Sequence, residues 1–175
     1  MAQYLIANGP MQTTAAFAAV TTGTAIKTML QVKPSATLGM RIIQWGYSLD
    51  SAAASVSAKI ELIETGTVFG TVTASVANDL TKYDAAALMG GDPTTNLIQV
   101  GTSATGYTCT SEGSITAVRN LDGPRIETMS TSFAVNFTNQ FPLGREPFVQ
   151  IANAMRIRVT TATAVNMYCY VIVEV

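Results

Sequence analysis

The last eleven residues of the chain, VNMYCYVIVEV, constrain its fold more than any other stretch. Side chains alternate between the two faces of a β-strand, so Tyr168, Tyr170 and Ile172 share one face. The opposite face carries Met167, Cys169, Val171 and Val173. Both faces are largely apolar, and an exposed edge strand of this kind would invite aggregation. The stretch therefore predicts a strand inside a sheet, with the Val171 face in a core and the Tyr170 face covered by a neighbouring subunit or another protein.

The charge content extends this argument to the whole surface. Only 12% of the 175 residues are charged and 48% are hydrophobic, whereas an ordinary globular domain has roughly 25% charged residues. We therefore expect part of the exterior to be buried against other chains, in a homo-oligomer. A net charge of −1 without a cluster of Lys and Arg speaks against nucleic-acid binding. The run TTAAFAAV (13–20) is too short to span a membrane, and no basic segment precedes it, so we expect neither a membrane anchor nor a signal peptide.

Most of the chain consists of short apolar or alternating runs separated by turn residues, which predict strands. The expected strands are IKTMLQV (26–32), MRIIQWGYSL (40–49), SVSAKIELIET (55–65), NLIQV (96–100), GYTCTSEG (106–113), SITAVRN (114–120), RIETMS (125–130), SFAVNFT (132–138), PFVQIA (147–152), MRIRVTT (155–161) and NMYCYVIVEV (166–175). TVFGTVTASV (67–76) is either a further strand or an irregular crossing. In MRIIQWGYSL, alternation places Ile43 on the same face as Trp45 and Tyr47.

Strands of this number and length favour an all-β fold, an antiparallel β-sandwich of jelly-roll type. The helical spacing of Leu80, Tyr83 and Leu88 predicts one short helix near residues 79–89. No linker or low-complexity tract interrupts the chain, so we expect one sandwich domain over residues 1–175. Residues 1–10 are expected to form an N-terminal arm or an edge strand.

The chain lacks the residues on which most catalytic sites depend. It has no histidine, which excludes Ser-His-Asp and Cys-His catalysis. Cys109 and Cys169 form no CxxC pair and no disulfide framework, so both are expected to be reduced and buried. Glu61 and Glu64 would lie on opposite faces of a strand, where they cannot flank one bond, and we interpret them as solvated charges. We therefore expect no enzyme activity and no cofactor.

Two weaker patterns are also interpreted as structural. The stretch MGGDPTTN lacks the lysine of a phosphate-binding loop, so its glycines predict a turn. Asp79, Asp84 and Asp92 do not follow the alternating spacing of a calcium loop. No bound metal is therefore expected.

Five segments in order resemble small all-β virion proteins of tailed bacteriophages, of the capsid decoration or minor head protein type. They are MRIIQWGYSLD, AKIELIET, GYTCTSEGSITA, QFPLGREPFV and MRIRVTTATAVNMYCYVIVEV. The resemblance runs from Gln3 to the C-terminus and rests on structural segments without a catalytic signature. It implies an accessory decoration (cement) protein, made in the host cytoplasm, that self-associates as a trimer and binds the major capsid protein on the capsid exterior. Another head or tail structural subunit is an alternative.

A carbohydrate- or receptor-binding β-sandwich of a phage particle is the alternative from another class, because β-sandwiches often display loop aromatics that stack on sugars. Here most aromatic residues fall within the strand patterns, which is typical of a core or an interface. The candidate residues for a subunit or capsid interface are Tyr4, Leu5, Ile6, Arg145, Tyr168, Tyr170 and Ile172. For Arg145, in the FPLGREPF loop, a carboxylate of a partner and a bond within its own subunit are both open.

Overall fold

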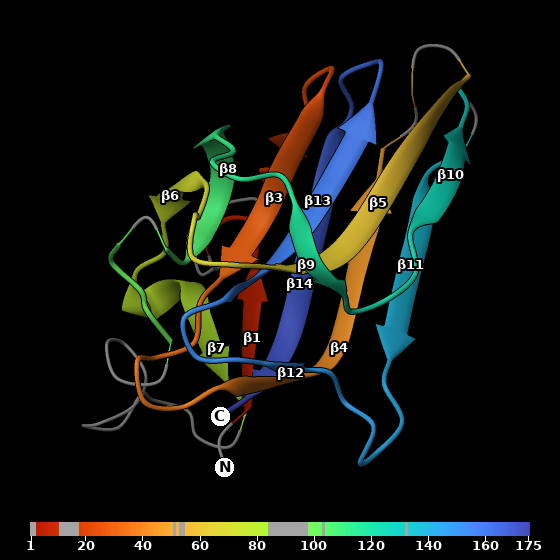
Figure 1. Ribbon diagram of the computed structural model, residues 1–175. Helices are drawn as coiled ribbons and strands as arrows, with labels where there is room; N and C mark the ends of the chain where they lie inside the picture. Colours follow the sequence, from red (N-terminus) through yellow and green to blue (C-terminus); the bar gives the residue numbers. More distant parts are fainter. Residues whose placement is uncertain are drawn as a thin grey trace.

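The computed structural model describes residues 3–10, 18–50, 52, 55–83, 98–102, 104–131 and 133–175. Among these residues, fourteen strands form two antiparallel sheets that pack face to face (Figure 1). The strands are β1 (Gln3–Ala7), β2 (Val20–Thr21), β3 (Ile26–Val32), β4 (Met40–Leu49), β5 (Val56–Thr65), β6 (Thr71–Ala74), β7 (Leu80–Lys82), β8 (Gly106–Ser111), β9 (Ala117–Asn120), β10 (Arg125–Met129), β11 (Val135–Gln140), β12 (Phe148–Val149), β13 (Ala154–Thr161) and β14 (Asn166–Glu174). The all-β prediction is confirmed.

The strand order is that of a jelly roll. Sheet A has the order β11-β4-β14-β1-β7, with β12 beside β4 and β2 beside β14. Sheet B has the order β10-β5-β13-β3-β8-β6, with β9 beside β5. Four strands of sheet A, in the order β1-β14-β4-β11, face four strands of sheet B, in the order β3-β13-β5-β10. In sheet A the last strand, β14, pairs with the first, β1, and in sheet B β13 pairs with β3. This nested pairing is the double Greek-key arrangement expected from the sequence.

The C-terminal strand lies in the middle of sheet A. β14 pairs with β4 on one side and with β1 on the other. Val171 and its neighbours on the same face are fully buried in the core between the sheets, whereas Tyr170 and Ile172 are half-buried on the opposite face. The position of this strand inside a sheet and the burial of its Val171 face are confirmed; the covering of the Tyr170 face by another subunit or protein stays a prediction.

In β4, the prediction for Ile43 is wrong. Trp45 and Tyr47 are buried in the core as expected, but Ile42 is the buried residue and Ile43 is only half-buried. The register between β4 and β14 shifts at this point, because Ile172 pairs with Gln44 while the next residue of β14 pairs with Ile42. Such a bulge inserts one unpaired residue and reverses the alternation beyond it.

The described part of the N-terminal segment, residues 3–10, is neither an arm nor an edge strand. β1 pairs with β14 along its whole length, and β7 pairs with its other edge. Tyr4 and Ile6 are fully buried in the core of their own subunit. The pairing of an early strand with the last one is a long-range contact that no local pattern indicates.

The expected helix near residues 79–89 does not begin where the spacing placed it. A 3-10 turn, η1, covers Ala77–Asp79, and the chain then continues as strand β7. Residues 84–89 lie outside the described part. Residues 80–82 pair with residues 4–6 of β1, so sheet hydrogen bonds override the helical spacing of the side chains.

Residues 112–116, between β8 and β9, cover part of the outer face of sheet B. Residues 112–116 cross β3 and β13 (Figure 1). The backbone amide and the hydroxyl of Thr28 donate to the two carboxylate oxygens of Glu112, at 2.7 and 2.6 Å. The guanidinium groups of Arg156 and Arg158, on β13, donate to the carbonyl oxygens of Glu112 and Ile115, at 2.8 and 2.5 Å. The chain itself thus covers this part of sheet B.

The two faces of β14 give a matched pair of substitutions. Val171→Asp places a carboxylate in the fully buried core, and we expect it to reduce the free energy of unfolding by roughly 3–5 kcal/mol or to prevent folding. Ile172→Asp, one residue away on the outer face, is expected to leave a folded subunit. Circular dichroism during thermal unfolding measures both. Equal stability of the two variants would contradict the assignment of the faces.

Candidate functional site

The centre of the outer face of sheet A is a broad surface without formal charge. Residues that pair directly across neighbouring strands point to the same side, so the register defines three rows across the sheet. The rows are Asn136-Ser48-Tyr168, Thr138-Gly46-Tyr170-Ala7 and Gln140-Gln44-Ile172-Leu5-Thr81. We call this surface the tyrosine face. Among the described residues of this face, charged side chains lie beyond these rows, for example where Arg41 pairs with Glu174 in register.

Tyr170 lies at the centre of the tyrosine face in a fixed orientation. A Cβ atom on Gly46 would stand 2.7 Å from the Tyr170 ring and 2.7 Å from the carbonyl oxygen of Phe137, so the ring lies over the glycine. Gln44 Nε2 donates to the Tyr170 hydroxyl at 2.7 Å, and Thr138 Oγ1 is 3.3 Å from it. The absence of a side chain at Gly46 therefore makes room for a flat aromatic surface on the sheet.

Two further tyrosines adjoin Tyr170. The Tyr168 ring has its centroid 5.9 Å from that of Tyr170. Burial raises the pKa of the Tyr168 phenol, and the neighbouring Cys169, Tyr170 and Tyr83 add to the effect. Burial likewise raises the pKa of Tyr83, with a contribution from Tyr170. These hydroxyls therefore stay protonated at neutral pH and keep their capacity to donate a hydrogen bond.

The structure places the predicted interface residues in three locations. Leu5 is on the tyrosine face beside Ile172, together with the two tyrosines of β14. Tyr4 and Ile6 point into the core, so they are wrong as interface residues. Arg145 is exposed on the loop between β11 and β12, separate from this face.

The loop that carries Arg145 ends in a well-defined turn. The Arg145 amide donates to the Pro142 carbonyl at 2.9 Å, and Gly144 has φ = +78°, a conformation that glycine adopts without strain. The Gly144 amide also donates to Glu146 Oε1 at 2.9 Å. Leu143, at the tip of this turn, is 97% exposed. We call residues 142–145 the Leu143 turn.

Both arms of the loop are tied to β4. The Phe141 amide donates to the Ile43 carbonyl, and the Ile42 amide donates to the Pro147 carbonyl, each at 2.9 Å. The β-bulge in β4 thus lies where the loop leaves the sheet. These hydrogen bonds hold the base of the loop in one position.

Sheet B carries a buried ionic layer under residues 112–116. Arg158 Nη2 is 2.9 Å from Glu61 Oε2, and Lys59 Nζ is 2.7 Å from Glu61 Oε1. Burial raises the pKa of the Glu61 carboxyl, but its hydrogen bonds to Lys59 and Arg158 outweigh burial and hold the pKa below its usual value. Arg156 is 1% exposed, and burial lowers the pKa of its guanidinium, against the opposing effect of Glu112.

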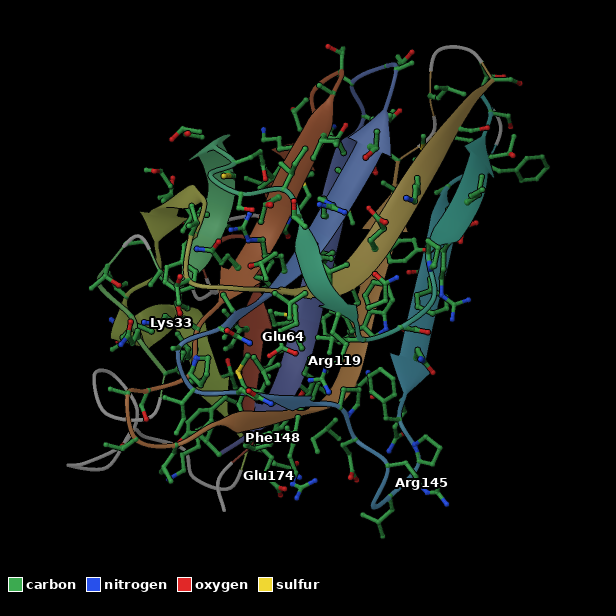
Figure 2. All side chains as sticks on the ribbon, in the orientation of Figure 1. Lys33, Glu64, Arg119, Arg145, Phe148 and Glu174 are labelled. Carbon is green, nitrogen blue, oxygen red and sulfur yellow. The ribbon has the colours of Figure 1, made fainter. Side chains whose placement is uncertain are left out.

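The interpretation of Glu61 and Glu64 as solvated charges is wrong. Glu64 is 2% exposed and receives Arg119 Nε at 2.9 Å and Asn153 Nδ2 at 2.8 Å. Arg119 also donates to the Phe148 carbonyl. Figure 2 shows Glu64, Arg119 and Phe148 close together and Arg145 apart from them on the projecting loop. Alternation along β5 predicted opposite orientations of the two carboxylates, but it did not predict the arginines that pair with them from the neighbouring strands β13 and β9.

The cysteines and carboxylates elsewhere in the described residues form no cluster that could bind a metal. Both cysteines are free and buried, as expected. No three metal-ligating side chains come together in the described ranges, and Asp79 accepts the Val76 amide at 2.9 Å. A hollow of about 500 Å³ beside Val165 and Asn166 has Asp50 as its one carboxylate among the described lining residues. No helix within these ranges is long and apolar enough to cross a membrane.

Comparison with known proteins adds no relative. The chain matches no protein-family model, no curated protein and no solved structure. The role of the chain is therefore inferred from its sequence and its own surfaces.

Sequence patterns identified the outward row of β14 but not the exposed leucine of the loop. Sequence patterns identified Tyr170 and Ile172 as an outward row, because alternation in a strand is a local property. They did not single out Leu143, although its place between Pro142 and Gly144 is a turn signal that predicts exposure.

The packing of Tyr170 on Gly46 is testable with a second glycine as control. Gly46→Ala places a methyl group against the tyrosine ring and a backbone carbonyl, so we expect the free energy of unfolding to fall by about 1–3 kcal/mol. Gly123→Ala meets no atom within 4 Å and is expected to change stability little. Chemical denaturation of both variants measures the difference, and equal stabilities would contradict the close approach.

The Glu61 ion pairs make stability depend on pH. Because its folded-state pKa is lowered, Glu61 stabilises the fold above the unfolded-state pKa of roughly 4.3, and this contribution is lost as pH falls through the folded-state pKa. Glu61→Gln is expected to cost about 2 kcal/mol at pH 7, and less as the pH is lowered below roughly 4. Urea denaturation from pH 7 to pH 3 tests this, and a difference constant over that range would contradict it.

Proposed function

We propose that this chain is an accessory structural protein of a bacteriophage virion, a decoration subunit that self-associates and binds the capsid exterior. The observation that carries the proposal is the tyrosine face: three rows of uncharged residues on one side of a jelly-roll sandwich. Jelly rolls are common in virion proteins, which is a likeness of fold alone. The resemblance of the sequence to phage decoration and minor head proteins supports the same role.

The tyrosine face has the chemistry of a subunit interface. Tyr170 and Ile172 supply apolar area, and the tyrosine hydroxyl retains a polar group for a wet interface. Strands about 4.8 Å apart and rows about 7 Å apart give these rows an area of roughly 400 Å². This is about half of the 800 Å² that each partner buries in a standard interface. The rows therefore form the centre of an interface, and residues around them complete it, with a trimer as the proposed assembly.

Trp45 and Tyr47, two of the largest aromatic side chains, are not available for carbohydrate binding. Trp45 and Tyr47 are buried, with their polar atoms bonded to Asp122 at 2.9 Å and Glu127 at 2.6 Å. Burial raises the pKa of the Tyr47 phenol far above its usual value, and its hydrogen bond to Glu127 adds to this effect. These two rings stabilise the sandwich and present no face to a sugar. Other head or tail positions would use the same tyrosine face.

Tyr170→Asp tests this function. We expect the variant to fold, because Tyr170 is outside the core, but to remain monomeric, since each copy would bring a charge into the interface. The control is Ile126→Asp, which changes a 74% exposed residue of β10 on sheet B and should assemble normally. Light scattering of the purified proteins and co-sedimentation with phage shells measure the outcome.

The result that contradicts the proposal is equally defined. A wild-type chain that is monomeric at micromolar concentration and does not bind shells would exclude a decoration role. Normal assembly of Tyr170→Asp would exclude the tyrosine face as the interface.

A further inference from the structure

Among the described residues, Leu143 is the most exposed large apolar side chain. It is 97% exposed, and the next, Ile126, is 74% exposed. The loop that carries it projects past the end of the sandwich where β12 and the C-terminus lie (Figure 1). A large apolar side chain that stands in water at the tip of a projecting loop is typical of an anchor residue at a protein contact.

The turn holds Leu143 in one geometry in the free protein. The turn is closed by the hydrogen bond from Arg145 to Pro142, Gly144 supplies the positive φ, and Glu146 binds the Gly144 amide. Both arms are hydrogen-bonded to β4. A loop held in this way loses little conformational freedom on binding, so more of the contact energy appears as affinity.

The charge beside the anchor is positive and available. Arg145 is exposed, and its guanidinium makes no hydrogen bond or ion pair with the described residues. One oxygen of the adjacent Glu146 carboxylate already accepts the Gly144 amide. The surface complementary to this turn therefore combines an apolar pocket for Leu143 with a carboxylate that pairs with Arg145.

We propose that Leu143 and Arg145 form the anchor by which this chain binds a different protein, one that presents an apolar pocket with a carboxylate at its rim. This inference rests on the proposed function, in which that protein is the major capsid protein. The tyrosine face then joins copies of the chain, and the Leu143 turn joins them to the shell.

Other occupants match the turn less well. Sugars stack on aromatic faces, which leucine lacks. A single leucine offers less apolar area than one acyl chain, which by itself gives only marginal membrane binding. In a second copy, the hollow beside Asp50 has the required carboxylate, but it is lined largely by threonine, asparagine and aspartate side chains.

The test uses shells of the encoding phage assembled without this chain, and it measures affinity by co-sedimentation. We expect Leu143→Asp and Arg145→Glu each to lower the affinity at least about tenfold, with unchanged circular dichroism and unchanged self-association. Leu143→Met should retain binding, because it keeps apolar volume at the tip. Ile126→Asp is the matched control for adding a charge at an exposed apolar position.

The outcomes separate this inference from the proposed function. Failure of the wild-type chain to bind shells overturns the decoration role and this assignment with it. Equal binding by wild type and Leu143→Asp overturns the anchor alone. Loss of self-association in Leu143→Asp without shells would assign the turn to a second copy, and Leu143-dependent binding to phosphatidylcholine–phosphatidylglycerol vesicles would assign it to a membrane; either overturns the anchor.

Discussion

The pairing of β14 with β4 and β1 is the constraint on which the rest of the structure depends. It places the C-terminal strand at the centre of sheet A and buries its Val171 face in the core. β13 occupies the equivalent place in sheet B, between β3 and β5. Since both central strands come from the end of the chain, neither sheet is complete until the last residues have paired. Folding therefore requires long loops to close before most of the apolar surface is buried.

This arrangement leaves two outer faces of opposite character. The outer face of sheet B is crossed by residues 112–116, and the buried guanidinium groups of Arg156 and Arg158 bind backbone carbonyls of that segment. The outer face of sheet A has an uncharged centre around Tyr170. Residues 112–116 thus cover part of sheet B, and sheet A carries the surface proposed for association.

Even fewer charged groups are free at the surface than the low charge content of the sequence suggests. Of the ten Lys and Arg residues, Arg156 and Arg158 are buried, and Arg119 is engaged with Glu64. Partly buried ion pairs of this kind hold loops to sheets and add little to solubility. Against this background the exposed and unpaired Arg145, next to a fully exposed leucine, is distinctive because charge and apolar area are concentrated at one small projection.

The sequence by itself determined the all-β class, the bounds of β3 and β4, and which side chains of β14 enter the core, because alternation and turn residues act over a few neighbouring positions. It therefore also identified Tyr170 and Ile172 as outward residues. Only the tertiary structure decided that Tyr4 is internal, that a bulge turns Ile43 out of the core, and that arginines of neighbouring strands pair with Glu61 and Glu64. Each of these depends on a partner strand far away in the chain, whose register no local pattern contains.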